Sequence, residues 1–275
     1  MSGAVLSREY KKTISGIGLR RGVRHAALSL VGQFAQFSEG PFLRCLYCHH
    51  VFEDQRARFG RLIRRLSRHG TFIDTDALLN LLKGTQPLNG RYFHLSFDDG
   101  LKNTFYNAAQ VLAEIGVPAT FFVPTAFVGT KASEAEYYSQ EVLNYNEPLK
   151  FMTWNEVRQL EAHGFDVGAH TRHHVRLAEV EDSDRLDQEI RGAKKDVEEA
   201  LGRSCDIMSW PFGTREDIHR PSRRLFREAG YQAVFGAFRG GISPGETNPY
   251  QIPRHHFEVE WPWSHVRVFA SGHFE

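Results

Sequence analysis

The 275-residue sequence has few cysteines, no long apolar run and almost no net charge. Its three cysteines, Cys45, Cys48 and Cys205, are an odd number and too few for a disulfide framework. The Cys45-x-x-Cys48 spacing occurs in zinc knuckles and redox pairs, but no second pair follows, so we expect all three to be reduced core residues. The formal net charge of +1 excludes a strongly basic nucleic-acid-binding protein as the default interpretation.

Long hydrophobic segments are also missing. No apolar run reaches the ~18 residues of a membrane span, and the stretch 14–19 is interrupted by Ser15, Gly16 and Gly18. Because this stretch lacks the continuous apolar core of a secretory signal, we expect a cytoplasmic protein. Residues 8–37 are basic and amphipathic, which suits peripheral contact with a membrane surface. A helix packed across the bottom of a barrel explains this composition equally well.

The most informative stretch is Leu95-Ser96-Phe97-Asp98-Asp99-Gly100, in which two adjacent carboxylates follow an apolar strand. The alternating pattern of residues 91–97 predicts a half-buried strand, so Asp98 and Asp99 leave its end in opposite directions, within reach of one site. Two acids near apolar residues repel each other and resist desolvation unless a positive group holds them. A divalent metal ion meets that need, although Asp-Asp-Gly also occurs as an ordinary turn.

Candidate partners of these acids lie in Gly168-Ala169-His170-Thr171-Arg172-His173-His174. The predicted strand 165–169 leads into this segment, and a one-turn helix after it would place His170 and His174 on one face. Two neutral imidazole nitrogens and one carboxylate form an open coordination set that leaves positions for water and substrate. Taken alone, the segment also fits a histidine-rich surface loop, because the chain contains 14 histidines.

Together the motifs resemble those of the polysaccharide deacetylase family, which shares the NodB homology domain and is of the carbohydrate esterase family 4 type. That family carries a Thr/Ser-Phe-Asp-Asp-Gly motif, a His-Ser/Thr-x-x-His motif and an aromatic-rich strand that ends in Pro-aromatic-Gly. Here they are matched by 96–100, 170–174 and 209–213. The resemblance covers residues 43–257. It implies a metal-dependent hydrolase of carbon–nitrogen bonds that removes an N-acetyl group from an amino sugar in a glycan or glycan precursor.

The resemblance also implies roles for individual residues. Asp98 is the implied catalytic base, and the implied ligands of a zinc ion (or of cobalt, nickel or iron) are Asp99, His170 and His174. The third motif implies a substrate-binding and oxyanion-stabilising element formed by Pro211, Phe212 and Gly213.

The sequence departs from the common form of the family. An arginine in the third motif, an Asp-x-x-Asp-Trp element and a histidine-bearing strand near the C-terminus are not visible. Instead, Leu-Tyr-Cys-His-His-Val at 46–51 resembles the Tyr-His-x-Val strand of the permuted subgroup that includes the poly-N-acetylglucosamine deacetylases. That alignment implies His49 as the general acid, with His50 as its competitor. Arg254 resembles a Pro-Arg element of the same subgroup and is our candidate to orient Asp98, the alternative being a surface arginine.

If the permutation is wrong, the general acid lies in the C-terminal part of the chain. The late histidines that could then take this role are His255, His256, His265 and His273.

Predicted strands and helices alternate along the chain, which is typical of parallel β/α units. We therefore expect an α/β fold, an irregular TIM-like barrel of about seven parallel strands, which the resemblance identifies as NodB-type. No internal repeat or linker is visible. We expect an N-terminal basic amphipathic segment, 1–40, and a single NodB-like deacetylase barrel domain, 41–275.

Sites in such barrels lie at the carboxyl ends of the strands, where all the motifs fall. The long insertion 126–150, with Tyr137, Tyr138 and Tyr145, lies on the same rim. It fits a lid or substrate wall, and an ordinary surface helix with aromatic packing fits it as well.

Two alternative functions remain at this point. A deformylase acting on a formamido sugar would need the same metal, base and acid. A carbohydrate-binding protein without catalysis would lack a ligand or the base, whereas all four core positions are intact. The expected partner is an N-acetylated sugar or glycan, and the sequence does not indicate an oligomeric state.

Overall fold

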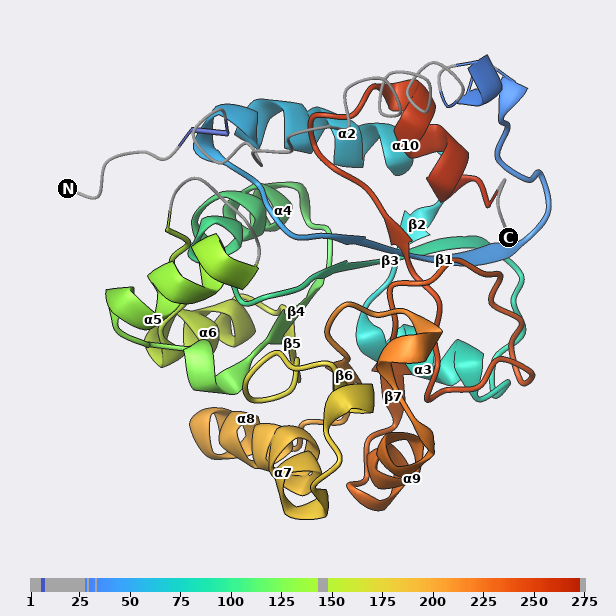
Figure 1. The fold of residues 1–275 in the computed structure, drawn as a ribbon. Helices are drawn as coiled ribbons and strands as arrows, with labels where there is room; N and C mark the ends of the chain where they lie inside the picture. Colours follow the sequence, from blue (N-terminus) through green and yellow to red (C-terminus); the bar gives the residue numbers. More distant parts are fainter. Residues whose placement is uncertain (1–5, 8–27, 29, 33, 143–147, 273–275) are drawn as a thin grey trace.

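The computed structural model describes residues 6–7, 28, 30–32, 34–142 and 148–272. Within these residues a parallel sheet curves into a barrel that helices surround (Figure 1). Most of the basic segment 8–37 lies outside the described residues, and so do Tyr145 and His273. None of the helices in the described part of the chain is both long enough and apolar enough to cross a membrane.

The strands pair in the order β7-β6-β5-β4-β3-β1-β8, with β2 paired to β3 beside this path. All of these pairs are parallel, which confirms the predicted irregular α/β barrel. The strands are β1 (Phe42–Cys48), β2 (Thr71–Phe72), β3 (Arg91–Phe97), β4 (Thr120–Val123), β5 (Asp166–Ala169), β6 (Ile207–Ser209), β7 (Ala233–Phe235) and β8 (His255–His256).

A short segment late in the chain closes the barrel. Ile252 forms a parallel bridge with Phe235 of β7. A few residues later, β8 pairs with Leu46 and Tyr47 of β1. The segment 252–256 therefore hydrogen-bonds to the last strand of the path on one side and to β1 on the other.

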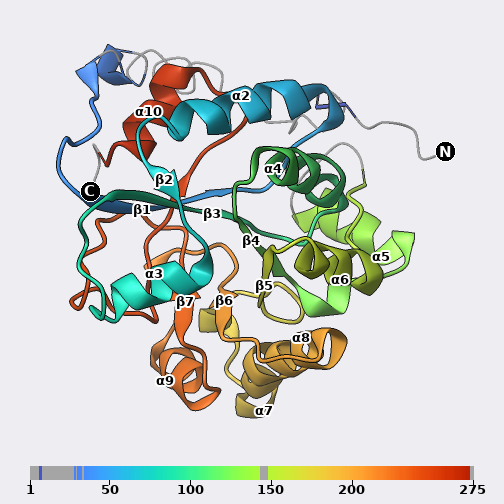
Figure 2. The same cartoon turned by 180° about the vertical axis from the view of Figure 1, so that it is seen from behind.

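The helices lie around the sheet, and the two views from opposite sides show α2 and α10 together on one side of β1 and β3 (Figures 1 and 2). The α-helices are α2 (Arg56–Leu66), α3 (Thr75–Leu82), α4 (Gln110–Ile115), α5 (Ala132–Tyr137), α6 (Trp154–Ala162), α7 (Ser183–Asp187), α8 (Ala193–Leu201), α9 (Arg220–Glu228) and α10 (Trp263–Ala270). Short 3₁₀ turns are Glu53–Gln55, Thr125–Phe127, Leu177–Glu179 and Arg215–Asp217, and π-helical turns are Thr104–Ala109, Tyr138–Val142 and Gln188–Gly192.

Helix α3 fills the amino-terminal end of the barrel. Its leucines, Leu78 and Leu82 among them, share a buried cluster with Leu43 and Cys45 of β1 and Phe235 of β7. Cys48 belongs to the other large cluster, as expected for residues on opposite faces of one strand. All three cysteines are buried and free.

Two helical regions contain π-helical turns. The turn Thr104–Ala109 runs directly into α4, which ends where Gly116 adopts a φ of +66°. The turn Gln188–Gly192 joins α7 to α8. Apolar periodicity does not reveal such turns, which often occur near functional sites. Thr153 and Glu156 form a capping box at the start of α6.

Candidate active site

Asp98, at the end of β3, is held by a buried arginine. Both guanidinium nitrogens of Arg254 donate to it, Nη1 to Oδ1 at 2.8 Å and Nη2 to Oδ2 at 2.7 Å. Arg254 also donates to the hydroxyls of Ser96 at 3.0 Å and Ser209 at 2.6 Å. Burial alone would raise the pKa of Asp98, but the charge and hydrogen bonds of Arg254, together with the nearby His170, more than offset this and lower the pKa. The carboxylate is therefore ionised and fixed in direction, as expected for Arg254.

Asp99 lies against the two predicted histidines. Its Oδ1 is 3.0 Å from His174 Nε2 and 3.3 Å from His170 Nε2. All three side chains are buried, and their ligand atoms lie within 4.8 Å of one another. Burial raises the pKa of Asp99, but His174 and His170 lower it well below the usual value. Two imidazole nitrogens and one ionised carboxylate oxygen directed at a common point fit a zinc-type ion.

The hydrogen bonds of the ring nitrogens that face away from Asp99 support this fit. His170 Nδ1 lies 2.8 Å from the carbonyl oxygen of Ser209. A carbonyl only accepts, so Nδ1 carries the proton and the neutral ring presents the Nε2 lone pair toward Asp99. On the other histidine, the hydroxyl of Tyr138 hydrogen-bonds to His174 Nδ1. Hydrogen bonds at Nδ1 thus orient both rings, with Nε2 directed toward Asp99.

The expectation of a one-turn helix after β5 is wrong. His170 to His174 form an irregular loop in which Thr171 has a φ of +57° and His174 a φ of +53°. Among the described residues, the non-glycine residues with positive φ are these two, Asp99 at +71° and Phe212 at +63°. All four belong to the site. Left-handed non-glycine residues cost free energy unless their surroundings hold them, so the convergence of the two histidines depends on the loop's contacts.

The main contact of that loop is Glu189, from the π-helical turn Gln188–Gly192. Its Oε2 accepts from the backbone N–H groups of Arg172 at 3.0 Å and His173 at 2.9 Å. Its Oε1 lies 2.7 Å from His173 Nδ1. The Glu189 residue is only 1% exposed, so three hydrogen bonds of a buried carboxylate hold the middle of the loop. The sequence alone does not mark this residue, because a glutamate on a helix gives no signal of such a contact.

The third motif places an aromatic ring beside the histidines. The rings of Phe212 and His174 are 5.2 Å apart, and the guanidinium of Arg176 stacks 3.7 Å over Phe212. Gly213 follows with a φ of +75°, and a Cβ there would lie 2.2 Å from the Cβ of Ala237, so only glycine fits. Phe212 thus lies beside a candidate metal ligand. The substrate-binding and oxyanion-stabilising role of Pro211, Phe212 and Gly213 stays a prediction.

His49, directly after β1, lies with two other polar residues. Its ring centroid is 5.2 Å from that of His256, and His256 Nε2 lies 3.0 Å from Glu258 Oε1. Burial lowers the pKa of His49, against the charge of Asp99, which raises it. Burial would raise the pKa of Glu258, but the neighbouring histidines lower it to about 2.

The competing histidines have other surroundings. His50 stacks on Phe52 with ring centroids 5.2 Å apart, and its Nδ1 lies 3.1 Å from Asn103 Nδ2. His255 Nε2 lies 3.3 Å from the carbonyl of Gly240. His265 packs edge-on against Trp261. Among the described histidines named as candidates, His256 lies closer to His49, at 5.2 Å between ring centroids, than His50 does, at 6.4 Å. The general-acid role of His49 stays a prediction.

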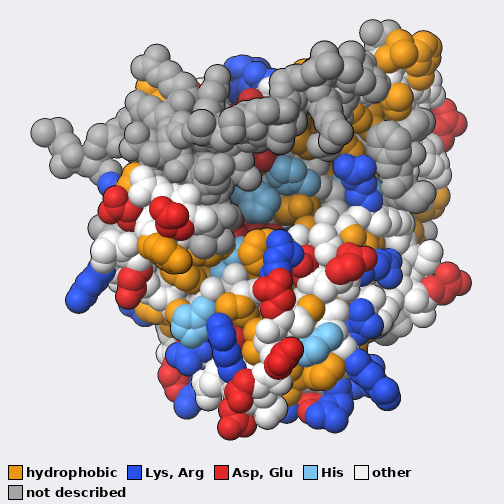
Figure 3. Space-filling model, in the orientation of Figure 1, with side chains coloured by type: hydrophobic (Ala, Val, Ile, Leu, Met, Phe, Trp, Pro, Cys, Tyr) orange, Lys and Arg blue, Asp and Glu red, His pale blue; other side chains and the backbone are white. Residues whose placement is uncertain are grey.

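The insertion 126–150 contributes to the site through Tyr138, whereas Tyr137 is 66% exposed. The sequence placed this insertion on the correct rim but did not predict the Tyr138 contact. In Figure 3, histidine side chains gather at a hollow near the centre of the face in view.

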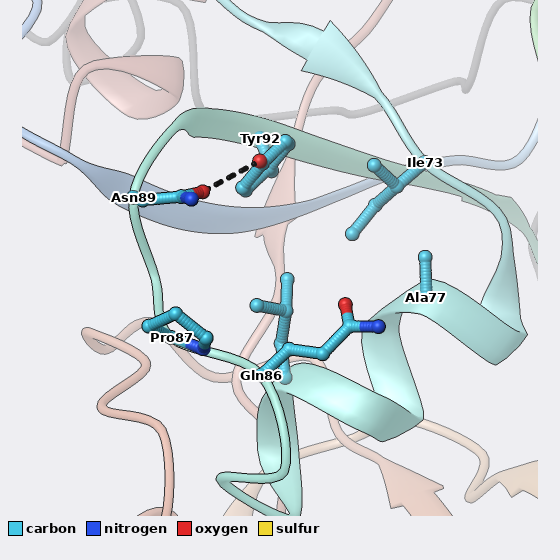
Figure 4. Close-up of a pocket in the computed structure, with 7 residues that line it drawn as sticks. Ile73, Ala77, Gln86, Pro87, Asn89 and Tyr92 are labelled. Atoms are coloured by element: carbon cyan, nitrogen blue, oxygen red, sulfur yellow. Dashed lines mark hydrogen bonds between the residues drawn. The ribbon is translucent and has the colours of Figure 1, made fainter.

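A separate hollow of about 240 Å³ lies between α3 and the start of β3. Figure 4 shows Ile73, Ala77, Gln86, Pro87 and Asn89 around it, with Asn89 accepting from the hydroxyl of Tyr92. Its lining contains no acid, histidine, lysine or arginine, and it lies at the amino end of β3, whereas Asp98 follows the carboxyl end. We assign it no part in the chemistry.

Comparison with known proteins gave one family. The family model described as "Polysaccharide deacetylase" matches residues 85–234. Poly-beta-1,6-N-acetyl-D-glucosamine N-deacetylases of several Staphylococcus aureus strains are 22% identical over 160 residues, which are 58% of this chain and 52% of the relative. The chain thus spans about half the length of the curated relatives it matches.

Solved structures share the fold. The structure of IcaB from Ammonifex degensii is 20% identical, with a TM-score of 0.71 over 86% of this chain and 100% of that chain. A de-N-acetylase from Aggregatibacter actinomycetemcomitans is 17% identical, with a TM-score of 0.67 over 82% of this chain and 99% of that chain. The BpsB deacetylase domain from Bordetella bronchiseptica is 19% identical, with a TM-score of 0.66 over 80% of this chain and 97% of that chain. At these identities the likeness shows the fold alone.

Proposed function

Because the chain belongs to the polysaccharide deacetylase family, hydrolases that act on carbon–nitrogen bonds, we propose that it is a metal-dependent N-deacetylase of a polymer of N-acetylglucosamine. The observation that carries this proposal is the pair of adjacent carboxylates with separate partners. Asp98 is bound by Arg254, whereas Asp99 faces His170 and His174. One acid is thus arranged as a base and the other as a ligand.

Asp99, His170 and His174 would hold the divalent ion. When bound, such an ion polarises the acyl oxygen of the substrate and lowers the pKa of a water molecule toward neutrality. The donor set of two nitrogens and one oxygen suits zinc, and leaves open positions for water and substrate. Cobalt, nickel and iron accept the same ligands.

The protein's own groups move the protons. Asp98, which Arg254 keeps ionised, takes a proton from the attacking water as its oxygen bonds to the acyl carbon. As the carbon–nitrogen bond breaks, His49 donates a proton to the departing amine, which is too basic to leave unprotonated. The products are the free carboxylic acid and the amino sugar. Backbone N–H groups at Phe212 are our candidates for stabilising the oxyanion.

The choice of polymer comes from the relatives. The Staphylococcus aureus proteins are named as N-deacetylases of poly-beta-1,6-N-acetyl-D-glucosamine. The ring of Phe212 is partly exposed, lies beside His174 and carries the stacked guanidinium of Arg176. An aromatic ring in this position offers an apolar surface of the kind that packs against a sugar ring. A carbohydrate-binding protein without catalysis would not need the buried Arg254–Asp98 pair.

Removal of the metal tests the proposal. We expect the purified protein to release acetate from oligomers of β-1,6-linked N-acetylglucosamine, to lose this activity on dialysis against a chelator, and to regain it with added zinc or cobalt. The measurement is an assay for free acetate, with metal content determined in the same samples. Full activity in metal-free protein would refute the proposed mechanism, and hydrolysis of a formamido sugar in place of the oligomers would refute the substrate.

A further inference from the structure

A second group of metal-ligating side chains lies outside the set Asp99, His170 and His174. One ligand atom each from His49, His256 and Glu258 lies within 4.8 Å of the other two. The three residues are near the carboxyl ends of β1 and β8, two strands that pair with each other. The proposed hydrolysis uses neither His256 nor Glu258.

The geometry of this cluster differs from that of an ordinary ion pair. His256 Nε2 lies 3.0 Å from Glu258 Oε1. That nitrogen is buried, and within the described chain it forms no hydrogen bond that meets the usual geometric criteria. Two polar groups that lie close together without a mutual hydrogen bond have the arrangement of two ligands that face a common third atom. Although the ligating nitrogen itself is buried, the two side chains are 29% and 30% exposed, so the cluster lies near the surface.

We propose that His49, His256 and Glu258 form a second divalent-cation site. Two imidazole nitrogens and one carboxylate oxygen are ligands that zinc binds at about 2.0–2.2 Å. In a tetrahedral site such ligands lie roughly 3.4 Å from one another, which small side-chain rotations reach from the observed spacing. Among biological cations, the set favours zinc and other late first-row ions over calcium and magnesium, which prefer oxygen.

The consequence for catalysis rests on the proposed function, in which His49 protonates the leaving amine. An imidazole that binds an ion is held in place by it, and the positive charge disfavours the protonated ring. Occupation of the second site therefore removes the general acid. Since the first site needs an ion and the second must lack one, activity should rise and then fall as free zinc increases.

Zinc binding tests the site without reference to activity. Metal-free protein is equilibrated with buffered zinc in the micromolar range, and bound zinc per chain is measured by calorimetry and elemental analysis. We expect two zinc ions per wild-type chain and one in Glu258→Gln, His256→Gln and His170→Gln. The control Glu260→Gln removes an equal charge two residues away from Glu258, outside the cluster, and should still bind two.

A wild type that binds one zinc overturns the proposal, and this result needs no variant to fold. Two zinc ions in both Glu258→Gln and His256→Gln would also overturn it, because the second ion would then lie elsewhere. Thermal unfolding of each variant shows whether a lost ion reflects the lost ligand or a lost fold.

Acetate release then tests the inhibition. We expect wild-type activity to pass through a maximum with zinc, and Glu258→Gln to retain the rising phase without the fall. A fall that persists in this variant overturns the inhibitory role. If the protein hydrolyses no acylated sugar at any zinc concentration, the proposed function fails, but the two-ion stoichiometry still decides the second site.

Discussion

Asp98 and Asp99 are neighbours in sequence, yet their side chains have different partners. Substitution of each should therefore affect metal content and activity differently. Asp98→Asn should keep its metal and lose activity by roughly a hundredfold or more, because the amide cannot accept the proton. Asp99→Asn should lose metal first, because it removes the anionic ligand. The measurement is zinc content together with the rate of acetate release.

Equal metal content and equal residual rates in the two variants would show that the roles are wrongly assigned. Full restoration of Asp99→Asn by excess zinc, with no such rescue of Asp98→Asn, is the pattern expected of a ligand and a base.

His49 gives a second prediction at the scale of a residue. His49→Gln should lower the rate without lowering zinc content at the first site, because the residue lies outside that ligand set. The defect should shrink for an activated ester, whose leaving group needs no proton. Equal defects on amide and ester substrates would assign the proton to another group, and His50→Gln is the matched comparison.

Part of the site could be predicted residue by residue. Asp98, Asp99, His170 and His174 stand in short motifs whose spacing carries the chemistry, and Arg254 was identified through the resemblance. Tyr138, Glu189 and Glu258 were not assigned a role, and His256 was named only as one of the late histidines that could replace His49. The contacts of Tyr138 and Glu189 join segments far apart in sequence, and no local pattern marks a side chain that will meet a loop 16 or 36 residues away.

At the scale of elements, the alternation of strands and helices was sufficient to predict the parallel barrel, because parallel strands need helical crossovers. The loop after β5 was not predictable in the same way. Thr171 and His174 adopt left-handed conformations, which sequence signals only when glycine or asparagine is present. His170 and His174 still converge, as they would on a helix. They do so on an irregular loop that Glu189 holds through hydrogen bonds.

That loop leads to a prediction about Glu189. Glu189→Gln should weaken zinc binding by roughly 10- to 100-fold, because an amide accepts at one oxygen only and the loop loses part of its support. The overall fold should change little, since the helix itself keeps its backbone hydrogen bonds. The measurement is zinc affinity by competition with a chelating dye.

Glu199→Gln on α8 is the matched control, because its side chain is 65% exposed and pairs with Lys195. Unchanged zinc affinity in Glu189→Gln would mean that the loop holds its shape without the carboxylate.

For the whole molecule, the barrel interior makes stability depend on pH. His94 is fully buried, its Nε2 lies 3.0 Å from the hydroxyl of Thr120, and its Nδ1 has no partner within the described chain. Burial, aided by the charge of Arg254, lowers the pKa of His94 to about 3. Between this value and the usual 6.5, only the unfolded chain binds the extra proton, so the free energy of unfolding falls as pH drops.

We therefore expect wild-type stability to decrease by about 1.4 kcal/mol per pH unit from this residue between pH 6.5 and pH 4. His94→Gln removes that contribution, so its stability should fall less steeply, whatever its value at pH 7. Urea unfolding at several pH values measures the slopes. His163→Gln, at an exposed position, should keep the wild-type slope, and parallel slopes for all three proteins would contradict the assignment.

The closing segment of the barrel has a consequence for how activity arises during synthesis. Arg254 contacts Asp98 across 156 residues of sequence, and β8 docks onto β1 only after the ribosome has made nearly all of the described chain. The ligands Asp99, His170 and His174 emerge much earlier. If the proposed function holds, a nascent chain would contain all three proposed metal ligands before Arg254 could orient Asp98, and hydrolysis would begin only when the last strand is in place.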